Sequence, residues 1–202
     1  MSRPRYIAFE GAEGCGKSTQ AAKFAERIGA VLTRETGGTG IGARLREILH
    51  DTDMTTMAHR AEALIAAADR AQHIEEVVRP ALAGGNTVVS DRSVYSTLAY
   101  QGYGRQLDVD EIKRINDWAI QGLWPDLIVF IDTPDEVIAE RMAKRTLDRF
   151  EAAGVAFHDR VIDGFRSMAA ADPGHWITYA AVGSIGDVAD GIAAMLAERG
   201  VR

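Results

Sequence analysis

The sequence predicts an α/β fold in which a parallel five-stranded β-sheet carries helices on both faces, with a short lid over the ligand site. Short apolar runs alternate along the chain with longer stretches whose apolar residues recur at helical spacing. Polar segments follow several apolar runs, as expected where loops at the carboxyl edge of a sheet bind ligands. We find no repeat or linker, so residues 1–202 are predicted to form a single domain.

The composition of the chain limits the classes of molecule that it is expected to bind. The chain is 47% hydrophobic and 26% charged, which is ordinary for a folded domain, and its net charge of −6 argues against a surface that coats nucleic acid. Anionic ligands must then be met by local arginines and lysines, which suits a small phosphorylated substrate. With one cysteine, no signal-type start and no membrane-length apolar run, we expect a cytoplasmic protein without membrane partners.

The first expected strand, residues 6–9, leads into a glycine-rich loop at residues 11–18 with the spacing G-x-x-x-x-G-K-S. Such loops turn backbone N–H groups toward phosphate oxygens, and the dipole of the following helix adds positive potential. Lys17 can then reach the β- and γ-phosphates, and Ser18 can ligate Mg²⁺. That helix is expected to end at Gly29. The alternative is a glycine-rich turn that binds nothing.

A second strand is expected at residues 31–33, followed by a polar loop at residues 34–40 that lies at the ligand-binding edge of the sheet. Arg44 and Arg46 come next on an amphipathic helix. Spacing alone favours solvated side chains for both arginines.

A long helical pattern runs from about Thr56 to Ala83 and ends at two glycines. Its interior is rich in alanine, so another backbone can approach it closely. Arg70 stands out there, because a cation among small residues is costly to bury unless it is paired or binds a ligand. His73 is interpreted as an ordinary surface or capping histidine.

The strand expected at residues 87–90 delivers Asp91 and Arg92 to the edge that carries the glycine-rich loop. The carboxylate of Asp91 can hold Mg²⁺, and Arg92 can bind a phosphate through two N–H groups. A structural ion pair between the two residues is the alternative. The following residues, 93–102, supply hydroxyls, a phenol and an amide that suit the polar edge of a heterocyclic base.

The rest of the chain continues the alternation. A helix is expected from Asp108 to Gly122, a buried strand at residues 127–131, a helix capped by Thr133, and a last strand at residues 175–179 before a closing amphipathic helix. Residues 144–149 contain three cations. They form either a solvated surface or a lid that brings arginine over a transferring phosphate.

Together, these motifs resemble the thymidylate kinase family, the enzymes that phosphorylate dTMP with ATP. The residues that carry the resemblance span essentially the whole chain: Phe9-Glu10-Gly11, Arg34-Glu35-x-Gly37-Gly38-Thr39, Ala67-Ala68-Asp69-Arg70-Ala71-Gln72-His73, Asp91-Arg92-Ser93, Ser96-Thr97-Leu98-Ala99-Tyr100-Gln101-Gly102, Leu147-Asp148-Arg149-Phe150-Glu151 and Phe157-His158-x-Arg160-Val161. The resemblance implies an ATP- and Mg²⁺-dependent transferase of nucleotide biosynthesis that forms dTDP for dTTP synthesis and assembles as a homodimer.

The resemblance also implies roles for individual residues. Catalysis would depend on Lys17, Arg92, Arg149, Arg145 and Glu13, with the lid at about residues 144–151. ATP would be bound by Gly11, Ala12, Glu13, Gly14, Cys15, Gly16, Lys17, Ser18, Thr19 and Arg141, and Mg²⁺ by Ser18 and Asp91. The acceptor dTMP would be bound by Glu13, Arg34, Arg46, Arg70, Arg92, Ser96, Thr97, Tyr100 and Gln101, with Tyr100 under the deoxyribose.

The chain resembles one branch of the family and departs from the family pattern at two positions. Gly14 stands where some members carry an arginine, so the chain resembles the branch whose catalytic arginine comes from the lid; Arg149 is the first choice and Arg145 the second. Thr36 replaces a proline, and Ala66 replaces the phenylalanine that stacks on thymine. Ile65 or Met57 could fill the resulting space, or the acceptor base could be different or larger.

Several alternatives stay open at this point. The acceptor could be another nucleoside monophosphate, a nucleoside or a small hydroxy acid. A GTPase-type switch would need a guanine-reading Asn-Lys-x-Asp, which is absent from the chain, and a regulator without catalysis is disfavoured because the catalytic residue types are present. Cys15 is either a thiol activated by the positive loop or a small buried filler.

Overall fold

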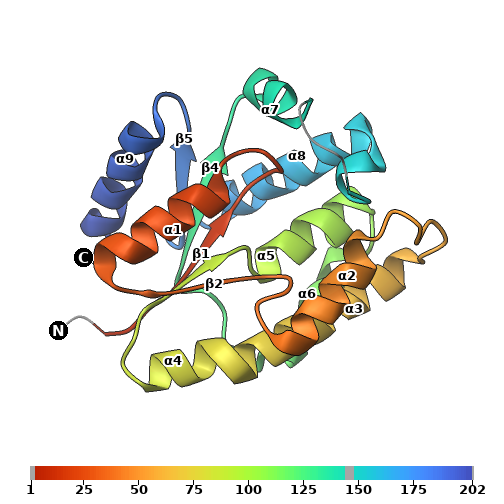
Figure 1. Ribbon diagram of the computed structural model, residues 1–202, viewed down its shortest axis with the longest axis horizontal. Coiled ribbons are helices and arrows are strands. Elements are labelled where there is room, and N and C mark those ends of the chain that lie inside the picture. The colour runs from red at the N-terminus through yellow and green to blue at the C-terminus, as the bar shows by residue number, and fades with distance from the viewer. Residues whose placement is uncertain (1–2, 144–147, 202) are drawn as a thin grey trace.

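The computed structural model describes residues 3–143 and 148–201. Its centre is a parallel sheet of β1 (Tyr6–Glu10), β2 (Val31–Arg34), β3 (Val88–Asp91), β4 (Leu127–Asp132) and β5 (Trp176–Ala180). The strand order is β2-β3-β1-β4-β5, with β1 in the middle (Figure 1). The five strands expected from the sequence are confirmed. Their order places the ends of β1, β2 and β3 side by side.

The two faces of the sheet are covered by different helices, because side chains alternate between faces along each strand. On one face, Ile7, Phe9 and Val129 pack against α1 (Lys17–Ile28) and α9 (Ile185–Glu198). On the other, Ile128 and Phe130 pack against α8 (Val155–Ala171). Figure 1 shows α1 and α9 together, with α8 across the sheet from them. The central strands are therefore buried on both sides and read as continuous apolar runs.

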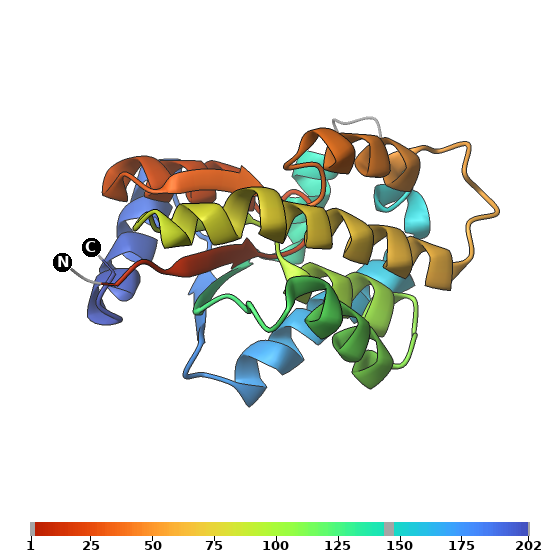
Figure 2. The ribbon, with the colours of Figure 1, turned by 90° about the horizontal axis from the view of Figure 1, so that it is seen from below.

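The long helix expected from about Thr56 to Ala83 is shorter and interrupted. It begins at His59 as α3 (His59–His73), widens into a π-helical turn at Ile74–Val78, and ends as α4 (Arg79–Ala83). Pro80 lies just after the turn and has no N–H to donate to the preceding helical turn, which explains why the regular pattern changes there. Figure 2 shows α3 and α4 as one rod beside α2 (Gly40–His50).

The polar residues after β3 also adopt a helical form. They make the short helix α5 (Val94–Thr97) and a π-helical turn at Leu98–Gly104. The helix expected from Asp108 is α6 (Val109–Ile120), and the Asp108 carboxylate accepts a hydrogen bond from the Glu111 N–H at 2.8 Å. In this way α6 begins where the sequence predicts.

Two features in the C-terminal half differ from expectation. The helix α8, which follows a 3₁₀ turn at Glu151–Ala153, was not among the expected elements. Its buried residues Phe157, Val161 and Phe165 do recur at helical spacing, but Gly164 breaks the pattern; a Cβ there would lie 2.7 Å from the Tyr103 ring. A helix, α7 (Asp135–Met142), follows Thr133 as expected, yet the Thr133 hydroxyl donates to the Cys15 carbonyl at 3.1 Å.

Among the described residues, no helix combines the length and the apolar content needed to cross a bilayer.

Candidate active site

The glycine-rich loop connects β1 to α1 and is held in the shape of a phosphate cradle. Gly11 has a φ of +149°, and a Cβ there would lie 2.8 Å from both the Cys15 sulfur and the Ile131 carbonyl oxygen, so only glycine fits. Lys17 is buried, with its Nζ 3.2 Å from the Ala12 carbonyl and 3.6 Å from the Glu13 carboxylate. The loop therefore holds its ammonium group inward, as binding of phosphate requires.

One cavity of about 450 Å³ opens where the ends of β1, β2 and β3 meet. Predicted site residues that line it are Glu13, Gly14, Gly16, Lys17, Ser18, Thr19, Arg34, Arg46, Arg70, Asp91, Arg92, Ser96, Thr97, Tyr100, Gln101 and Arg141. Gly11, Ala12, Cys15 and Arg149 are not part of the lining, and Arg145 lies outside the described residues. The parallel topology thus gathers most of the predicted residues around a single space.

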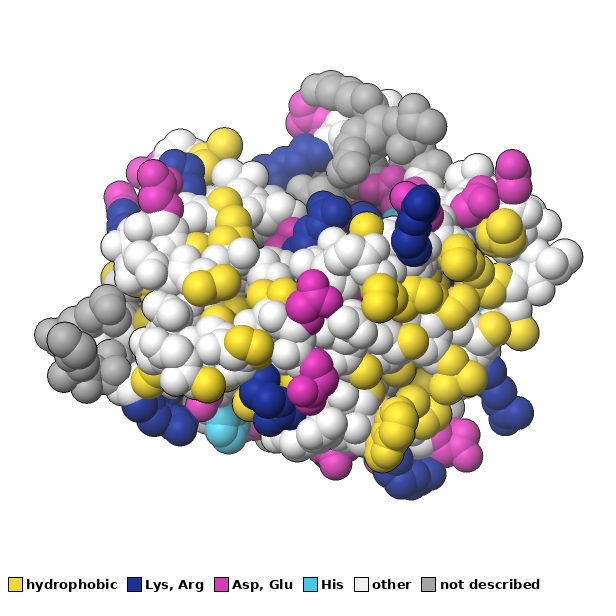
Figure 3. Space-filling model, turned by 60° about the horizontal axis from the view of Figure 1, so that its bottom comes forward, with side chains coloured by type: hydrophobic (Ala, Val, Ile, Leu, Met, Phe, Trp, Pro, Cys, Tyr) yellow, Lys and Arg dark blue, Asp and Glu magenta, His cyan; other side chains and the backbone are white. Residues whose placement is uncertain are grey.

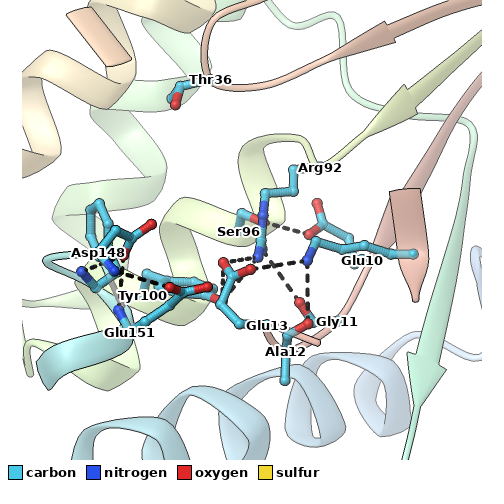
Figure 4. Close-up of polar contacts among 12 residues, drawn as sticks. Glu10, Gly11, Ala12, Glu13, Thr36, Arg92, Ser96, Tyr100, Asp148 and Glu151 are labelled. Carbon is cyan, nitrogen blue, oxygen red and sulfur yellow. Dashed lines mark hydrogen bonds and ion pairs between the residues drawn. The ribbon is translucent and has the colours of Figure 1, made fainter. Parts of the chain in front are cut away.

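Arg92 is the centre of the polar network on the cavity wall (Figure 4). Its guanidinium forms an ion pair with Glu13 and donates to Ser96 Oγ at 2.9 Å and to the Tyr100 hydroxyl at 3.1 Å. Its φ of 73° is unusual for a residue other than glycine. Glu13, and not Asp91, is therefore its partner, contrary to the alternative of an Asp91–Arg92 pair.

The carboxylate of Glu13 is held ionised. Burial raises its pKa, but the cations of Arg92 and Lys17 outweigh burial and keep the pKa well below its usual range. The phenol of Tyr100 lies 3.3 Å from the same carboxylate. Glu13 thereby fixes the orientation of two cations and one phenol that face the cavity.

The pKa of Glu10 is displaced in the opposite direction. It is fully buried at the end of β1 and accepts hydrogen bonds from the hydroxyls of Ser93 at 2.7 Å and Ser96 at 2.6 Å. Burial raises the pKa of its carboxyl group to about 7, in spite of Arg92 and the two hydroxyls, which lower it. No separate role for Glu10 was expected from the sequence.

Arg70 is paired, which fulfils one of the two expectations for a cation among small residues. Its Nε donates to Glu35 at 2.7 Å, and its Nη2 donates to the Thr97 hydroxyl at 3.0 Å. Asn116 of α6, which sequence reasoning missed, accepts a further bond from its Nη1. Arg70 also lines the cavity, so the ion pair with Glu35 holds its side chain at the cavity wall.

The prediction for His73 is wrong. Its ring is fully buried; Nδ1 donates to Glu35 at 2.7 Å, and Nε2 lies 2.7 Å from the Thr33 hydroxyl. Burial raises the pKa of Glu35, but Arg70 and His73 outweigh it and lower that pKa overall. His73 lies one helical turn after Arg70, on the same inward face of α3, which is the signal that could have identified it.

The acceptor side of the cavity contains two residues expected at the base edge. The Thr97 hydroxyl accepts from Arg70, and Gln101 Nε2 donates to Glu62 at 2.8 Å. Spacing predicted exposed side chains for both Arg44 and Arg46. Arg44 is exposed, but Arg46 is half-buried and donates to the Thr36 carbonyl at 3.2 Å. Arg46 is therefore the member of this pair that faces the site.

Glu62 is a fully buried carboxylate that sequence reasoning missed. It accepts bonds from Arg149 Nη1 at 2.6 Å and from Arg105 Nη2 at 3.1 Å, and the Arg149 Nε donates to the Leu49 carbonyl at 2.8 Å. Burial raises the pKa of Glu62, but these donors and Gln101 lower it overall. The first-choice lid arginine is thus bound to α3 in this structure.

Comparison with known proteins agrees with this geometry. Residues 9–192 match the family model described as "Thymidylate kinase". A thymidylate kinase from Synechococcus sp. (strain JA-2-3B'a(2-13)) is 46% identical over 189 residues, covering 91% of this chain and 90% of that protein. One from Lactobacillus helveticus (strain DPC 4571) is 41% identical over 206 residues, covering 98% and 97%. The chain belongs to the thymidylate kinase family.

The fold is shared with a thymidylate kinase whose structure has been solved. The crystal structure of thymidylate kinase from Ehrlichia chaffeensis superposes with a TM-score of 0.80 at 29% sequence identity, covering 96% of this chain and 99% of that one. The expected α/β kinase fold is therefore confirmed over nearly the full length of the chain.

The positions that depart from the thymidylate kinase pattern have identifiable surroundings. Ala66 is buried on the cavity wall. Ile65 and Met57, which were expected as possible replacements for an aromatic ring, pack against the same apolar cluster but do not line the cavity. Phe150 does line it.

Cys15 is a packing residue. Its side chain is 2% exposed and lies in the core cluster with Ile7 and Phe9. Burial raises the pKa of the thiol, and the nearby cation of Lys17 does not compensate. The burial and the raised pKa therefore favour the filler interpretation over an activated thiolate.

The residues present fit a Mg²⁺ ion. The Oδ1 atom of Asp91 is buried without a hydrogen-bond partner, and both Asp91 and Ser18 line the cavity. Carboxylate and hydroxyl oxygens are ligands that Mg²⁺ accepts, and it takes its other ligands from water and substrate phosphates. Among the described residues, no three or more His, Cys, Asp or Glu side chains are grouped so that they could hold a metal ion.

Proposed function

We infer that this chain transfers the γ-phosphate of ATP to dTMP, giving dTDP and ADP. Membership of the thymidylate kinase family supports the reaction. The observation that carries the inference is one cavity in which the phosphate loop with Lys17 faces the Arg92 network and the acceptor-side residues around Arg70. Donor and acceptor phosphates can meet there without a covalent enzyme intermediate.

We propose that the loop at residues 11–18 binds the phosphates of ATP. Its N–H groups and the Lys17 ammonium supply positive potential, and Arg141 lines the cavity beside it, with its Nη1 donating to the Gly14 carbonyl at 2.8 Å. A bound Mg²⁺ would be held by Ser18 and Asp91 and would neutralise phosphate charge. A single domain, with its lid at about residues 144–151, contains these parts.

In the proposed reaction, a phosphate oxygen of dTMP attacks the γ-phosphorus in line. The new P–O bond forms as the bond to the β-phosphate oxygen of ATP breaks, and the electron pair leaves with ADP. Arg92 is placed to hold the acceptor phosphate because Glu13 and Ser96 fix its guanidinium at the cavity wall. The chain's own contribution is alignment and stabilisation of the developing negative charge.

A lid arginine is proposed to complete the charge stabilisation, since Gly14 leaves the loop without one. Arg149 is the first candidate and Arg145 the second. Because Arg149 is bound to Glu62 here, it would exchange this carboxylate for a phosphate oxygen when both substrates are present. Glu62 would then hold the arginine only between turnovers.

The sugar is proposed to lie against Tyr100. Its phenol is held by Arg92 and Glu13, so it cannot move aside easily for an additional hydroxyl group. We therefore expect deoxyribonucleotides to be preferred over ribonucleotides.

Incubation with Mg-ATP and a panel of nucleoside monophosphates, scored for diphosphate product, tests the function. dTMP should be the best acceptor and UMP a poor one. Equal turnover of dTMP and UMP would contradict the proposal, and preference for another monophosphate would identify a different acceptor.

We also propose a homodimer in the cytoplasm. Large apolar side chains are exposed on three neighbouring helices: Ile41 and Ile48 on α2, Leu64 on α3 and Trp118 on α6. Figure 3 shows hydrophobic side chains gathered over the half of the molecule that these helices build. A second copy would remove this surface from water.

A further inference from the structure

The acceptor side of the cavity has few apolar side chains. Arginines, carboxylates, hydroxyls and an amide form most of its wall, and the buried apolar residues that line it are Leu49, Ala66, Tyr100 and Phe150. A pyrimidine is flat, and its two faces are less polar than its edge. Among the apolar side chains, a bound base can pack on one of these four.

Tyr100 is committed to the phosphate end of the cavity. Its hydroxyl is bonded to Arg92 and lies beside Glu13, the residues next to the phosphate loop. Leu49 and Ala66 offer aliphatic groups only. Among the described residues, this leaves Phe150 as the remaining carbon ring on the cavity wall.

The ring of Phe150 is held firmly in place. Asp148 Oδ1 accepts bonds from the backbone N–H of Phe150 at 2.8 Å and of Glu151 at 2.9 Å, while its Oδ2 lies 2.7 Å from His50 Nδ1. The ring contacts His50 edge to face, with centroids 5.3 Å apart, and the Arg149 guanidinium lies 4.6 Å above the ring centroid. Phe150 is thus fixed against the end of α2 before any ligand enters.

We propose that Phe150 determines specificity for the acceptor base by supplying the aromatic surface on which the thymine ring packs. This rests on dTMP being the acceptor. Ala66, in the same apolar cluster, contributes only a methyl group and leaves the room that the base requires. The base-binding surface therefore comes from the C-terminal end of the lid and not from α3.

This placement couples the base to the lid. Phe150 follows Arg149 directly, and the two side chains are in contact. A base that packs on Phe150 holds the same short segment that carries the first-choice lid arginine. Binding of the base at Phe150 would then restrict the position of Arg149, the adjacent residue.

Calorimetric binding of two ligands separates the role of the base from that of the phosphate. The probes are dTMP and 2-deoxyribose 5-phosphate, which lacks the base. Phe150→Ala should weaken dTMP binding about 5- to 100-fold, which is the range for loss of one aromatic stacking partner. The affinity for 2-deoxyribose 5-phosphate and the KM for ATP should not change. Phe150→Trp should retain dTMP binding, and Phe150→Leu, which keeps bulk without the ring, should be intermediate.

Phe157→Ala is the matched control. Phe157 belongs to the same cluster and contacts the Tyr100 ring with centroids 6.0 Å apart, but it does not line the cavity. This variant should lower the melting temperature without changing the ratio of the two affinities. Equal losses for both ligands, or no loss for dTMP, in Phe150→Ala and Phe150→Leu would overturn the inference. If the unaltered enzyme fails to phosphorylate dTMP, the proposed function itself falls.

Discussion

The buried carboxylates around the cavity differ in the direction in which their pKa is displaced. Glu13, Glu35 and Glu62 each pair with at least one cation, which outweighs burial and lowers the pKa. Glu10 receives only two hydroxyl donors, and burial raises its pKa from 4.5 to about 7. Because burial raises the pKa of all four carboxyl groups, the net direction for each depends on whether it is paired directly with a cation.

The raised pKa of Glu10 predicts a pH dependence of stability. Between pH 4.5 and 7 the folded protein binds this proton more tightly than the unfolded chain does, so the free energy of unfolding falls as pH rises through this range. The loss should approach about 3 kcal/mol, at about 1.4 kcal/mol per pKa unit. Denaturant titrations of the protein and of Glu10→Gln should show this loss: the variant keeps an uncharged side chain, so it should gain stability relative to the unaltered protein as pH rises from 4.5 to 7.

The exposed Glu26 provides a control for this measurement, since Glu26→Gln makes the same chemical change at the surface. Its stability should follow that of the unaltered protein at each pH. Parallel curves for Glu10→Gln and the unaltered protein would show that Glu10 does not titrate in this range.

Cys15 leads to a prediction about reactivity. Because its thiol is buried and its pKa is raised, a small thiol reagent should leave the folded enzyme unmodified and fully active, and should label Cys15 only in denaturant. Cys15→Ala should remain active. Mass spectrometry after treatment provides the measurement, and native labelling that Mg-ATP prevents would revive the activated-thiolate interpretation.

At the scale of elements, the segment 148–151 is tied to two helices. Asp148 and Arg149 bind the last residues of α2, and Arg149 also binds Glu62 on α3. The neighbouring residues 144–147, with Arg145, lie outside the described part of the chain. The catalytic arginine therefore remains a prediction that kinetics can decide.

Arg149→Ala should lower kcat by about 10³-fold or more, the effect of losing an arginine that stabilises the transferring phosphate. Substrate KM values should change less, as steady-state assays can show. Arg105→Ala is the matched control, because Arg105 also pairs with Glu62 but does not line the cavity. An effect confined to Arg145→Ala would transfer the role to that residue, and no effect of either would leave the charge run as a solvated surface.

For the molecule as a whole, the proposed dimer face predicts a change of oligomeric state. Leu64→Asp places a charge among the exposed apolar groups of α2, α3 and α6, and should convert the dimer to a monomer. Sedimentation velocity measures this directly. Val182→Asp, at an exposed apolar residue between β5 and α9, should not change the state; a monomeric unaltered protein would contradict the proposal.

Local signals made much of the fold predictable. Each of the five strands is a short apolar run, and the glycine-rich loop at residues 11–18 carries its conformational requirement in its own residues. The π-helical turn at Ile74–Val78 and the helix α8 were missed. The π-helical turn was missed because the helical pattern continues on both sides of Pro80. The helix α8 was missed because Gly164 interrupts its apolar pattern, and this glycine makes room for Tyr103, which is distant in sequence.

The sequence by itself determined the strands, the phosphate loop and the family, because these depend on residues close together in the chain or on the order of motifs. Tertiary structure alone decided which partners the charged residues have. Glu62 meets Arg149 from 87 residues away, and Arg70 meets Asn116 from 46 residues away. Burial makes an unpaired charge costly, so such pairs are fixed by packing between elements, which spacing along the chain does not encode.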